Sequence, residues 1–341
     1  MSLKEPHGGW DAWAIWNMHA RFLFRGDLDW RNVFSAAIDW THSDYPFLIP
    51  GLIARCWRFI GKEMVWPPCA IAMLFTLGTA GVIISSLSII KGKIDGLLGG
   101  LMLMGTSFFI QHGASQYVDV PLSFFFCSVL ALFSIIDFSY HDRQKLLPLA
   151  GMMAAFSAWT KNEGIVFLFS LIAARFIIVI RSRGFKAYMK ETGLLIIGIM
   201  PVALVLAYFK LYLAPRNDLS RGNFLATVTD FPRYLFIIKA FLGQFIHFGA
   251  FFIGAIPLLF IYLFISGVSI KKKYISVPAT SFIVLCLMTC FYFLVYLITP
   301  RDLSWHLGTS LDRLFLQLWP STILFIFLIA KPIEGDQLTL Q

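Results

Sequence analysis

Long stretches of mainly apolar residues, separated by short polar or charged segments, follow one another from residue 67 almost to the end of the chain. They lack the alternation of apolar and polar residues that a β-barrel wall requires, and most approach the roughly 20 residues that a helix needs to cross a bilayer. The pattern predicts an all-α polytopic membrane protein with about nine spans. We expect these spans near residues 67–90, 96–111, 120–138, 146–160, 164–181, 192–213, 241–266, 276–298 and 314–330.

The first 66 residues have a different pattern, with no apolar run of membrane length and with seven of the ten tryptophans of the chain. The segments 12–24 and 47–60 mix apolar, aromatic and charged residues, which is typical of helices that lie in the membrane interface. We therefore divide the chain into two parts. Residues 1–66 are expected to form an external region with amphipathic interface helices, and residues 67–341 a transmembrane helical bundle with short loops.

The composition supports a membrane protein, because 58% of the residues are hydrophobic and only 14% are charged, against roughly 25% charged in soluble domains. A soluble fold of this size cannot bury that much apolar surface. The composition therefore excludes an ordinary soluble enzyme, a disordered chain and a disulfide scaffold. The net charge of +9 is explained by cations that set membrane topology, and nucleic acid is not an expected partner.

Cations recur in every second loop, and nine spans place these loops on one side, which the positive-inside rule makes cytoplasmic. The external side then includes the first 66 residues. Because these residues carry several arginines and would not cross a membrane easily, we expect a further transmembrane helix to precede them. The loop cations are Lys91, Lys93, Arg143, Lys145, Arg181, Arg183, Lys186, Lys190, Lys271, Lys272, Lys273 and Lys331.

Five short motifs with side chains capable of acid–base or phosphate chemistry lie on the predicted external side. Ionisable groups at membrane depth are costly and usually functional, and scattered helix caps would not need to favour one face. We therefore interpret the motifs as parts of one site. The candidate residues are Asp11 in GGWDAWAIW, His42, Asp44 and Tyr45 in THSDYP, Tyr117 and Asp119 in QHGASQYVDVP, Lys161 in WTKNEG, and Arg313 in TSLDR.

Each motif also has a plainer interpretation. The carboxylates of Asp11, Asp44 and Asp119 could simply cap helices. Lys161 could be a solvated turn residue. Arg313 could form a surface ion pair with the aspartate before it, which would stabilise the fold little.

Carboxylates and cations together at a lipid boundary suit one reaction well. A carboxylate can take a proton from an acceptor hydroxyl, and cations can stabilise a departing lipid phosphate. A polyprenyl-phosphate sugar supplies such a leaving group, and its long tail explains why the site is at a membrane. A divalent metal ion is a further option, because Asp11, Asp119 and His42 could converge on one ion, although their spacing does not require it.

The motifs WDAWAIW, HSDYP, YVDVPL, AWTKNEG and SLDRLFLQLWP, in this order, resemble the GT-C superfamily of membrane glycosyltransferases. The resemblance is to the bacterial branch related to protein O-mannosyltransferases and the lipid-A aminoarabinose transferase, and it covers most of the chain. It implies a GT-C-like helical bundle with its active site on the external face. It also implies that the first external loop contains interface helices and the catalytic aspartate.

The resemblance assigns roles to individual residues. By position, Asp11 matches the catalytic aspartate, Asp119 the second acidic motif and Lys161 the basic residue near the donor phosphate, and Arg313 is a looser match to a phosphate-binding residue. The family's usual acidic pair is Asp-Glu, whereas Ala12 follows Asp11 here.

A second carboxylate must therefore come from another segment, and Asp44 is our candidate. We expect His42, Tyr45 and Tyr117 to contact substrate.

Together with the resemblance, which implies an inverting displacement, these observations predict a hexosyl- or pentosyltransferase of the cell envelope, placed in a bacterial plasma (inner) membrane and acting on its periplasmic face. Its partners would be a polyprenyl-phosphate-sugar donor, a glycan, lipid or protein acceptor, and membrane lipid. One alternative is a transporter or flippase, which would need ionisable groups near the bilayer midplane and broken helices. Another is a truncated, inactive homologue, which an in-frame apolar segment upstream of the chain would argue against.

Overall fold

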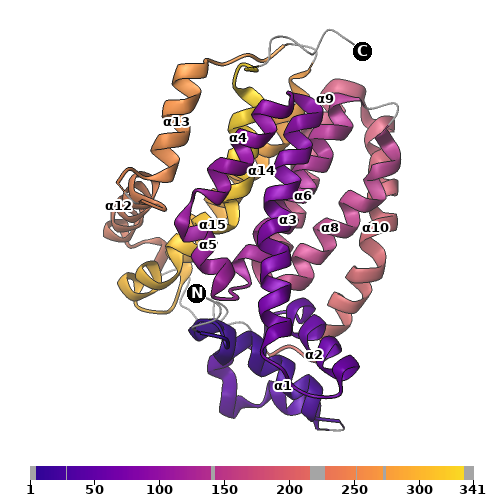
Figure 1. The fold of residues 1–341 in the computed structure, drawn as a ribbon, viewed down its shortest axis with the longest axis vertical. Coiled ribbons are helices and arrows are strands. Elements are labelled where there is room, and N and C mark those ends of the chain that lie inside the picture. The colour runs from indigo at the N-terminus through magenta and orange to yellow at the C-terminus, as the bar shows by residue number, and fades with distance from the viewer. Residues whose placement is uncertain are drawn as a thin grey trace.

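The computed structural model describes residues 5–333 apart from 28, 140–142, 216–226, 251 and 272–273, and the described residues form helices that pack into one bundle (Figure 1). In chain order the α-helices are α1 (Asn17–Arg25), α2 (Leu48–Ile60), α3 (Trp66–Ile90), α4 (Lys93–Met104), α5 (Ser107–Ala114), α6 (Asp119–Phe138), α8 (Leu147–Thr160), α9 (Asn162–Arg183), α10 (Phe185–Tyr212), α12 (Phe231–His247), α13 (Ala255–Ser266), α14 (Ser276–Ile298) and α15 (Leu303–Ile329).

Six of these helices, α3, α6, α9, α10, α14 and α15, are long and apolar enough to cross a membrane. The pair α4 and α5, bent by 64°, makes a seventh if it counts as one span. The expected count of nine spans is not confirmed. The predicted span 146–160 is the 14-residue helix α8, and the predicted span 241–266 is divided into α12 and α13.

Two glycines explain the division between α12 and α13. Gly249 has a left-handed backbone with φ of 61°, which favours glycine. At Gly254 a Cβ atom would lie 1.9 Å from the carbonyl oxygen of Ile246, so only glycine allows this close approach. An apolar run of membrane length therefore folds as two shorter helices.

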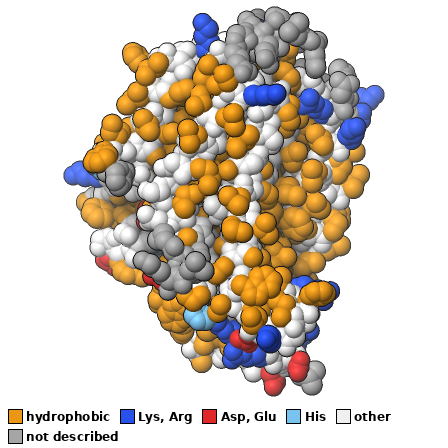
Figure 2. Space-filling view, viewed as in Figure 1, with side chains coloured by type: hydrophobic (Ala, Val, Ile, Leu, Met, Phe, Trp, Pro, Cys, Tyr) orange, Lys and Arg blue, Asp and Glu red, His pale blue; other side chains and the backbone are white. Residues whose placement is uncertain are grey.

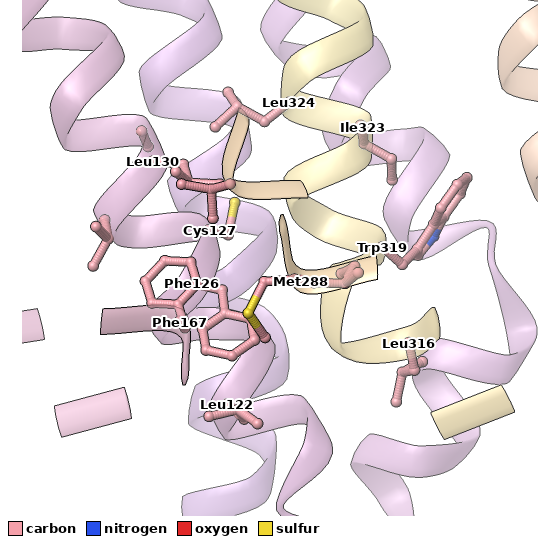
Figure 3. Packing of buried hydrophobic residues seen from close by; sticks show 14 of the residues in the cluster. Leu122, Phe126, Cys127, Leu130, Phe167, Met288, Leu316, Trp319, Ile323 and Leu324 are labelled. Carbon is pink, nitrogen blue, oxygen red and sulfur yellow. The ribbon is translucent and has the colours of Figure 1, made fainter. Parts of the chain in front are cut away.

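Helix α6 is the centre of the bundle, with 83% of its apolar segment buried, and it contacts α3, α8, α14 and α15. Phe126 of α6 stacks on Phe167 of α9 with ring centroids 4.1 Å apart, and Met288 lies close by (Figure 3). Trp319 of α15 belongs to the same buried cluster. Apolar side chains cover the middle of the face seen in Figure 2, as a surface in contact with lipid requires. The core therefore lies between the helices, around α6.

The short amphipathic helices expected near the N-terminus are present. Residues 12–60 contain the π-helical segment Ala12–Trp16, α1, two 3₁₀ segments and α2, and they pack together at one end of the bundle (Figure 1). Trp10, Trp13 and Trp40 are about half exposed there and contact one another. Such exposed tryptophans suit a membrane interface, and the position of these helices in a bilayer stays a prediction.

A buried ionic cluster ties four helices together at the opposite end of the bundle. Arg175 of α9 pairs with Asp137 of α6 and with Glu191 of α10, each at 2.6 Å, and donates to Thr280 of α14. Arg183 contacts both carboxylates. Because the charges are paired and hydrogen-bonded, they can stay inside the bundle.

Candidate active site

Asp119, the first residue of α6, is the centre of a buried group of charges next to the N-terminal helices. Its Oδ1 atom lies 3.0 Å from Nζ of Lys161, and its Oδ2 atom lies 3.1 Å from Nε of Arg313. Lys161 stands between α8 and α9, and Arg313 is in α15. The side chain of Asp119 is 2% exposed. Three distant segments of the chain therefore meet at one carboxylate.

A further carboxylate binds each cation. Nη2 of Arg313 lies 2.8 Å from Oδ2 of Asp11, and Nζ of Lys161 lies 2.9 Å from Oε1 of Glu163. The five residues thus form an alternating series, Asp11, Arg313, Asp119, Lys161 and Glu163, which we call the charge row. With three carboxylates and two cations, the charge row carries one net negative charge.

A chain of two buried polar side chains fixes Asp119, since Gln317 contacts Asp119 and Tyr292 contacts Gln317. Nε2 of Gln317 donates to Oδ1 of Asp119 at 2.5 Å, and the hydroxyl of Tyr292 donates to Oε1 of Gln317 at 2.7 Å. Gln317 follows Arg313 by one helical turn in α15, so both side chains reach Asp119 from the same face of that helix. Charge-assisted hydrogen bonds of this kind fix the orientation of a carboxylate.

Aromatic rings line the charge row. Nζ of Lys161 lies 5.6 Å from the ring centroid of Tyr45, and that ring is stacked by Trp16 at 5.6 Å and by His42 at 5.1 Å. The guanidinium of Arg313 lies 5.3 Å from the ring of Tyr117. Both distances are within the range of cation–π attraction.

Two glycines dock the segment that carries Asp11. A Cβ atom on Gly8 would lie 2.7 Å from the carbonyl oxygen of Ser115, and one on Gly9 would lie 2.6 Å from the ring of Tyr117. Gly8 also has a left-handed φ of 75°. The backbone can therefore lie directly against the loop before α6, and this contact brings Asp11 to Arg313.

Backbone geometry also fixes the two charges of the WTKNEG motif. Lys161 is extended, with φ of −157° and ψ of 158°, and α9 begins at the next residue. A Cβ atom on Gly164 would lie 1.9 Å from the carbonyl oxygen of Ser157, so glycine allows α8 and α9 to join closely. This tight connection lets Lys161 bind Asp119 and Glu163 together.

Asp44, our candidate for a second carboxylate, lies beside the charge row. Its Oδ2 atom accepts from Nδ2 of Asn162 at 2.8 Å, and its carbonyl oxygen accepts from Nζ of Lys210 at 2.7 Å. Lys210 also donates to Oδ1 of Asn162 at 2.6 Å. Asp44 is thus hydrogen-bonded outside the charge row, whose three carboxylates are Asp11, Asp119 and Glu163.

The plainer interpretations do not describe these side chains. Asp11 makes no capping hydrogen bond in the structure as described and binds Arg313 instead. Helix α2, which follows Asp44, has Phe47 at its N-cap. Lys161 is only 3% exposed, so it is not a solvated turn residue. The side chain of Arg313 binds Asp11 and Asp119, so it is not limited to a surface ion pair with Asp312.

Electrostatics keep Lys161 charged and Tyr45 neutral. Burial alone would lower the pKa of the Lys161 ammonium, but the carboxylates of Asp119 and Glu163 overcome this effect and raise the pKa above its ordinary value. Burial raises the pKa of the Tyr45 phenol. The positive charge of Lys161 is thus available at any physiological pH.

The described residues contain no group of three or more His, Cys, Asp or Glu side chains suited to holding a metal ion. Asp11 and Asp119 both bind Arg313, and His42 stacks on Tyr45. These carboxylates are therefore engaged by a cation of the chain itself.

The sequence prediction does not include several residues of the site, although most of them stand in a sequence context that could have identified them. Asn162 and Glu163 stand in the WTKNEG motif beside Lys161, and Gln317 shares a helix face with Arg313. Lys210 is an ionisable residue in a long apolar run, which is itself an indication of function. Tyr292 is one tyrosine in an aromatic helix and left no such signal.

Comparison with known proteins gave similarity in structure alone. No protein-family model matches the chain, and no curated protein matches it. Two crystal structures of ArnT from Cupriavidus metallidurans match at 13% identity: the apo state with a TM-score of 0.53 over 91% of this chain, and the undecaprenyl phosphate complex with 0.55 over 94%.

The chain spans 54–55% of the length of those ArnT chains. ArnT is the lipid A aminoarabinose transferase and has the GT-C fold. The shared fold, together with helices that are long and apolar enough to cross a bilayer, shows that this chain is an integral membrane protein of the GT-C fold.

Proposed function

We propose that this protein is a membrane glycosyltransferase that transfers a sugar from a polyprenyl-phosphate-linked donor to an acceptor hydroxyl. The charge row carries the proposal, because it gathers two cations and an accessible carboxylate at one end of a transmembrane bundle. The likeness in fold to an ArnT structure bound to undecaprenyl phosphate supports a lipid phosphate as part of the donor.

Arg313 is the cation best placed to receive the donor phosphate. Its side chain is 19% exposed, whereas that of Lys161 is 4% exposed. A guanidinium can also bind a phosphate through two parallel N–H groups. Lys161, on the other side of Asp119, adds its positive charge and is the second candidate contact.

Asp11 is the best candidate for the general base, because its side chain is 11% exposed and that of Asp119 only 2%. In the proposed reaction the Asp11 carboxylate takes the proton of the acceptor hydroxyl. The acceptor oxygen bonds to the anomeric carbon while the bond from that carbon to the phosphate oxygen breaks. The electron pair leaves with the phosphate, whose charge Arg313 and Lys161 stabilise, and the anomeric configuration inverts.

His42, Tyr45 and Tyr117 are our candidates for contacts with the sugar, because Tyr45 and Tyr117 lie beside the two cations and His42 stacks on Tyr45. Asp44, which accepts from Asn162, is the further carboxylate that we propose for the site. The site is at the end of the bundle where the N-terminal helices pack, and the loops after α3 and α9, which carry predicted cytoplasmic cations, are at the other end (Figure 1). This arrangement supports a periplasmic location in a bacterial inner membrane. A glycan, lipid or protein hydroxyl is the acceptor class we propose.

Transfer of radiolabelled sugar from polyprenyl-phosphate donors in membranes tests the proposal. We expect transfer by the wild type and by Glu63→Gln, a control whose carboxylate pairs with Arg21 and Arg25 outside the site. Asp11→Asn should remain folded and lose about 10²–10⁴ in rate. Undiminished transfer by Asp11→Asn would refute the role of Asp11. Movement of the labelled lipid across vesicles without transfer would favour a flippase instead.

A further inference from the structure

One buried carboxylate oxygen in the charge row has no hydrogen-bond partner among the described residues. Oε1 of Glu163 binds Lys161, while Oε2 is buried and unpaired. Asp119 differs, because both of its oxygens are occupied: Oδ1 accepts from Lys161 and Gln317, and Oδ2 accepts from Arg313. The buried open acceptor of the charge row is therefore at its Glu163 end.

A buried carboxylate oxygen without a donor is unfavourable and needs an explanation. Stabilisation of the fold does not explain it, since one oxygen of Glu163 is sufficient for the ion pair with Lys161. The tight join at Gly164 nevertheless holds the side chain in this position. An acceptor kept open inside a site is satisfied when a ligand brings a donor.

The neighbours of Glu163 indicate which donor fits. Lys161 already balances the charge of this carboxylate, so a neutral hydroxyl is sufficient. The ring of Tyr45, which is only partly buried, lies next to Lys161, with its centroid 5.6 Å from Nζ. In the proposed reaction Arg313 receives the phosphate on the anomeric carbon, and Lys161, on the other side of Asp119, is its second contact. A hydroxyl on the adjacent ring carbon is a neutral donor that could extend past Lys161 to Glu163.

We propose that Oε2 of Glu163 accepts a hydrogen bond from the donor-sugar hydroxyl next to the anomeric carbon, and that it thereby selects sugars that carry this hydroxyl. The inference rests on the proposed function and refines it, because it names the donor class. A sugar that is deoxy at this position would leave Oε2 unpaired and would bind less tightly.

Binding in nanodiscs separates this inference from the proposed function. The probes are undecaprenyl phosphate, undecaprenyl-phosphate glucose and its 2-deoxyglucose analogue. A hydrogen bond to a charged acceptor predicts that the wild type binds the glucose form about 10- to 100-fold more tightly than the deoxy form. In Glu163→Gln the ratio should fall to about 3-fold or less, while undecaprenyl phosphate binds as before. Glu63→Gln, with a similarly exposed carboxylate outside the site, should keep the wild-type ratio.

An unchanged ratio in Glu163→Gln, with undecaprenyl phosphate still bound, would overturn the inference and leave the proposed function intact. Failure of the wild type to bind undecaprenyl phosphate would overturn both. If Glu163→Gln does not fold, Glu163→Asp decides the question. The aspartate keeps a carboxylate near Lys161, but its shorter side chain moves the oxygen that corresponds to Oε2 away from the donor sugar. Glu163→Asp should therefore also lose the preference for the glucose form over the deoxy form. A retained preference would contradict the inference.

Discussion

Replacing Lys161 with Met tests whether the ion pairs within the charge row hold this part of the fold together. Met keeps most of the length and volume of the lysine stem and removes only the ammonium. The charge row then changes from one net negative charge to two. Asp119 retains Arg313 and Gln317, but Oε1 of Glu163 loses the cation that it binds.

The size of the effect follows from this difference between the two carboxylates. Breaking a buried ion pair by removing one partner typically costs about 3–5 kcal/mol. Because Asp119 keeps two donors and the Glu163 side chain is 17% exposed, we expect a loss near the lower end, about 3 kcal/mol. Adding Glu163→Gln removes the stranded carboxylate. The double variant should therefore recover about 1 kcal/mol or more relative to Lys161→Met.

Equilibrium unfolding in mixed micelles, followed by tryptophan fluorescence, measures these differences. Lys186→Met, at an exposed lysine near the opposite end of the bundle, is the matched control and should change stability by less than about 0.5 kcal/mol. A loss below about 1 kcal/mol in Lys161→Met, or strictly additive effects in the double variant, would show that the charge row is not energetically coupled.

Three further predictions concern other parts of the molecule. Gly164→Ala should separate α8 from α9 and lower the thermal unfolding temperature strongly, whereas Gly193→Ala, with open space around its Cβ position, should not; equal effects would contradict the packing argument. Burial, and then the proximity of His42, lower the pKa of His19 to about 3. Between about pH 6.5 and pH 3 the imidazole of His19 is therefore protonated in the unfolded chain and neutral in the folded chain. The free energy of unfolding should consequently decrease as the pH falls below 6.5, by up to about 1.4 kcal/mol per pH unit. Tryptophan fluorescence at pH 7.5 and 5.5 should show this dependence in the wild type and a weaker one in His19→Gln, and identical curves would refute it. Cysteine placed at Trp30 should react with an impermeant reagent from the external side, and labelling only from the cytoplasm would overturn the topology.

Much of the architecture could be predicted because helix length and apolarity are local properties. The limits of α3, α6, α9 and α14 follow from apolar runs, and the N-terminal short helices follow from tryptophan-rich amphipathic segments. The break between α12 and α13 was also signalled locally, by Gly249 and Gly254. A prediction based on hydrophobicity misses this break, because the two glycines end the helix but do not interrupt the run of apolar residues.

The site was predicted as a set of residues but not as a set of contacts. Asp119 and Arg313 are 194 residues apart, and periodicity in either helix does not reveal that α6 and α15 pack together. Sequence position could therefore suggest that both face the same side of the membrane. It could not show that Asp119 would be shared by two cations, or that Glu163 would bind Lys161 while Asp44 binds Asn162.

The ionic cluster around Arg175 has a consequence for how the protein enters the membrane. Alone in lipid, α9 would carry an unbalanced guanidinium, and α6 and α10 would each carry an unbalanced carboxylate. Each charge is neutralised only when its partner helix is beside it. We therefore expect these helices to leave the insertion machinery together, with α6 held at the translocon until α9 and the hairpin to α10 have been synthesised.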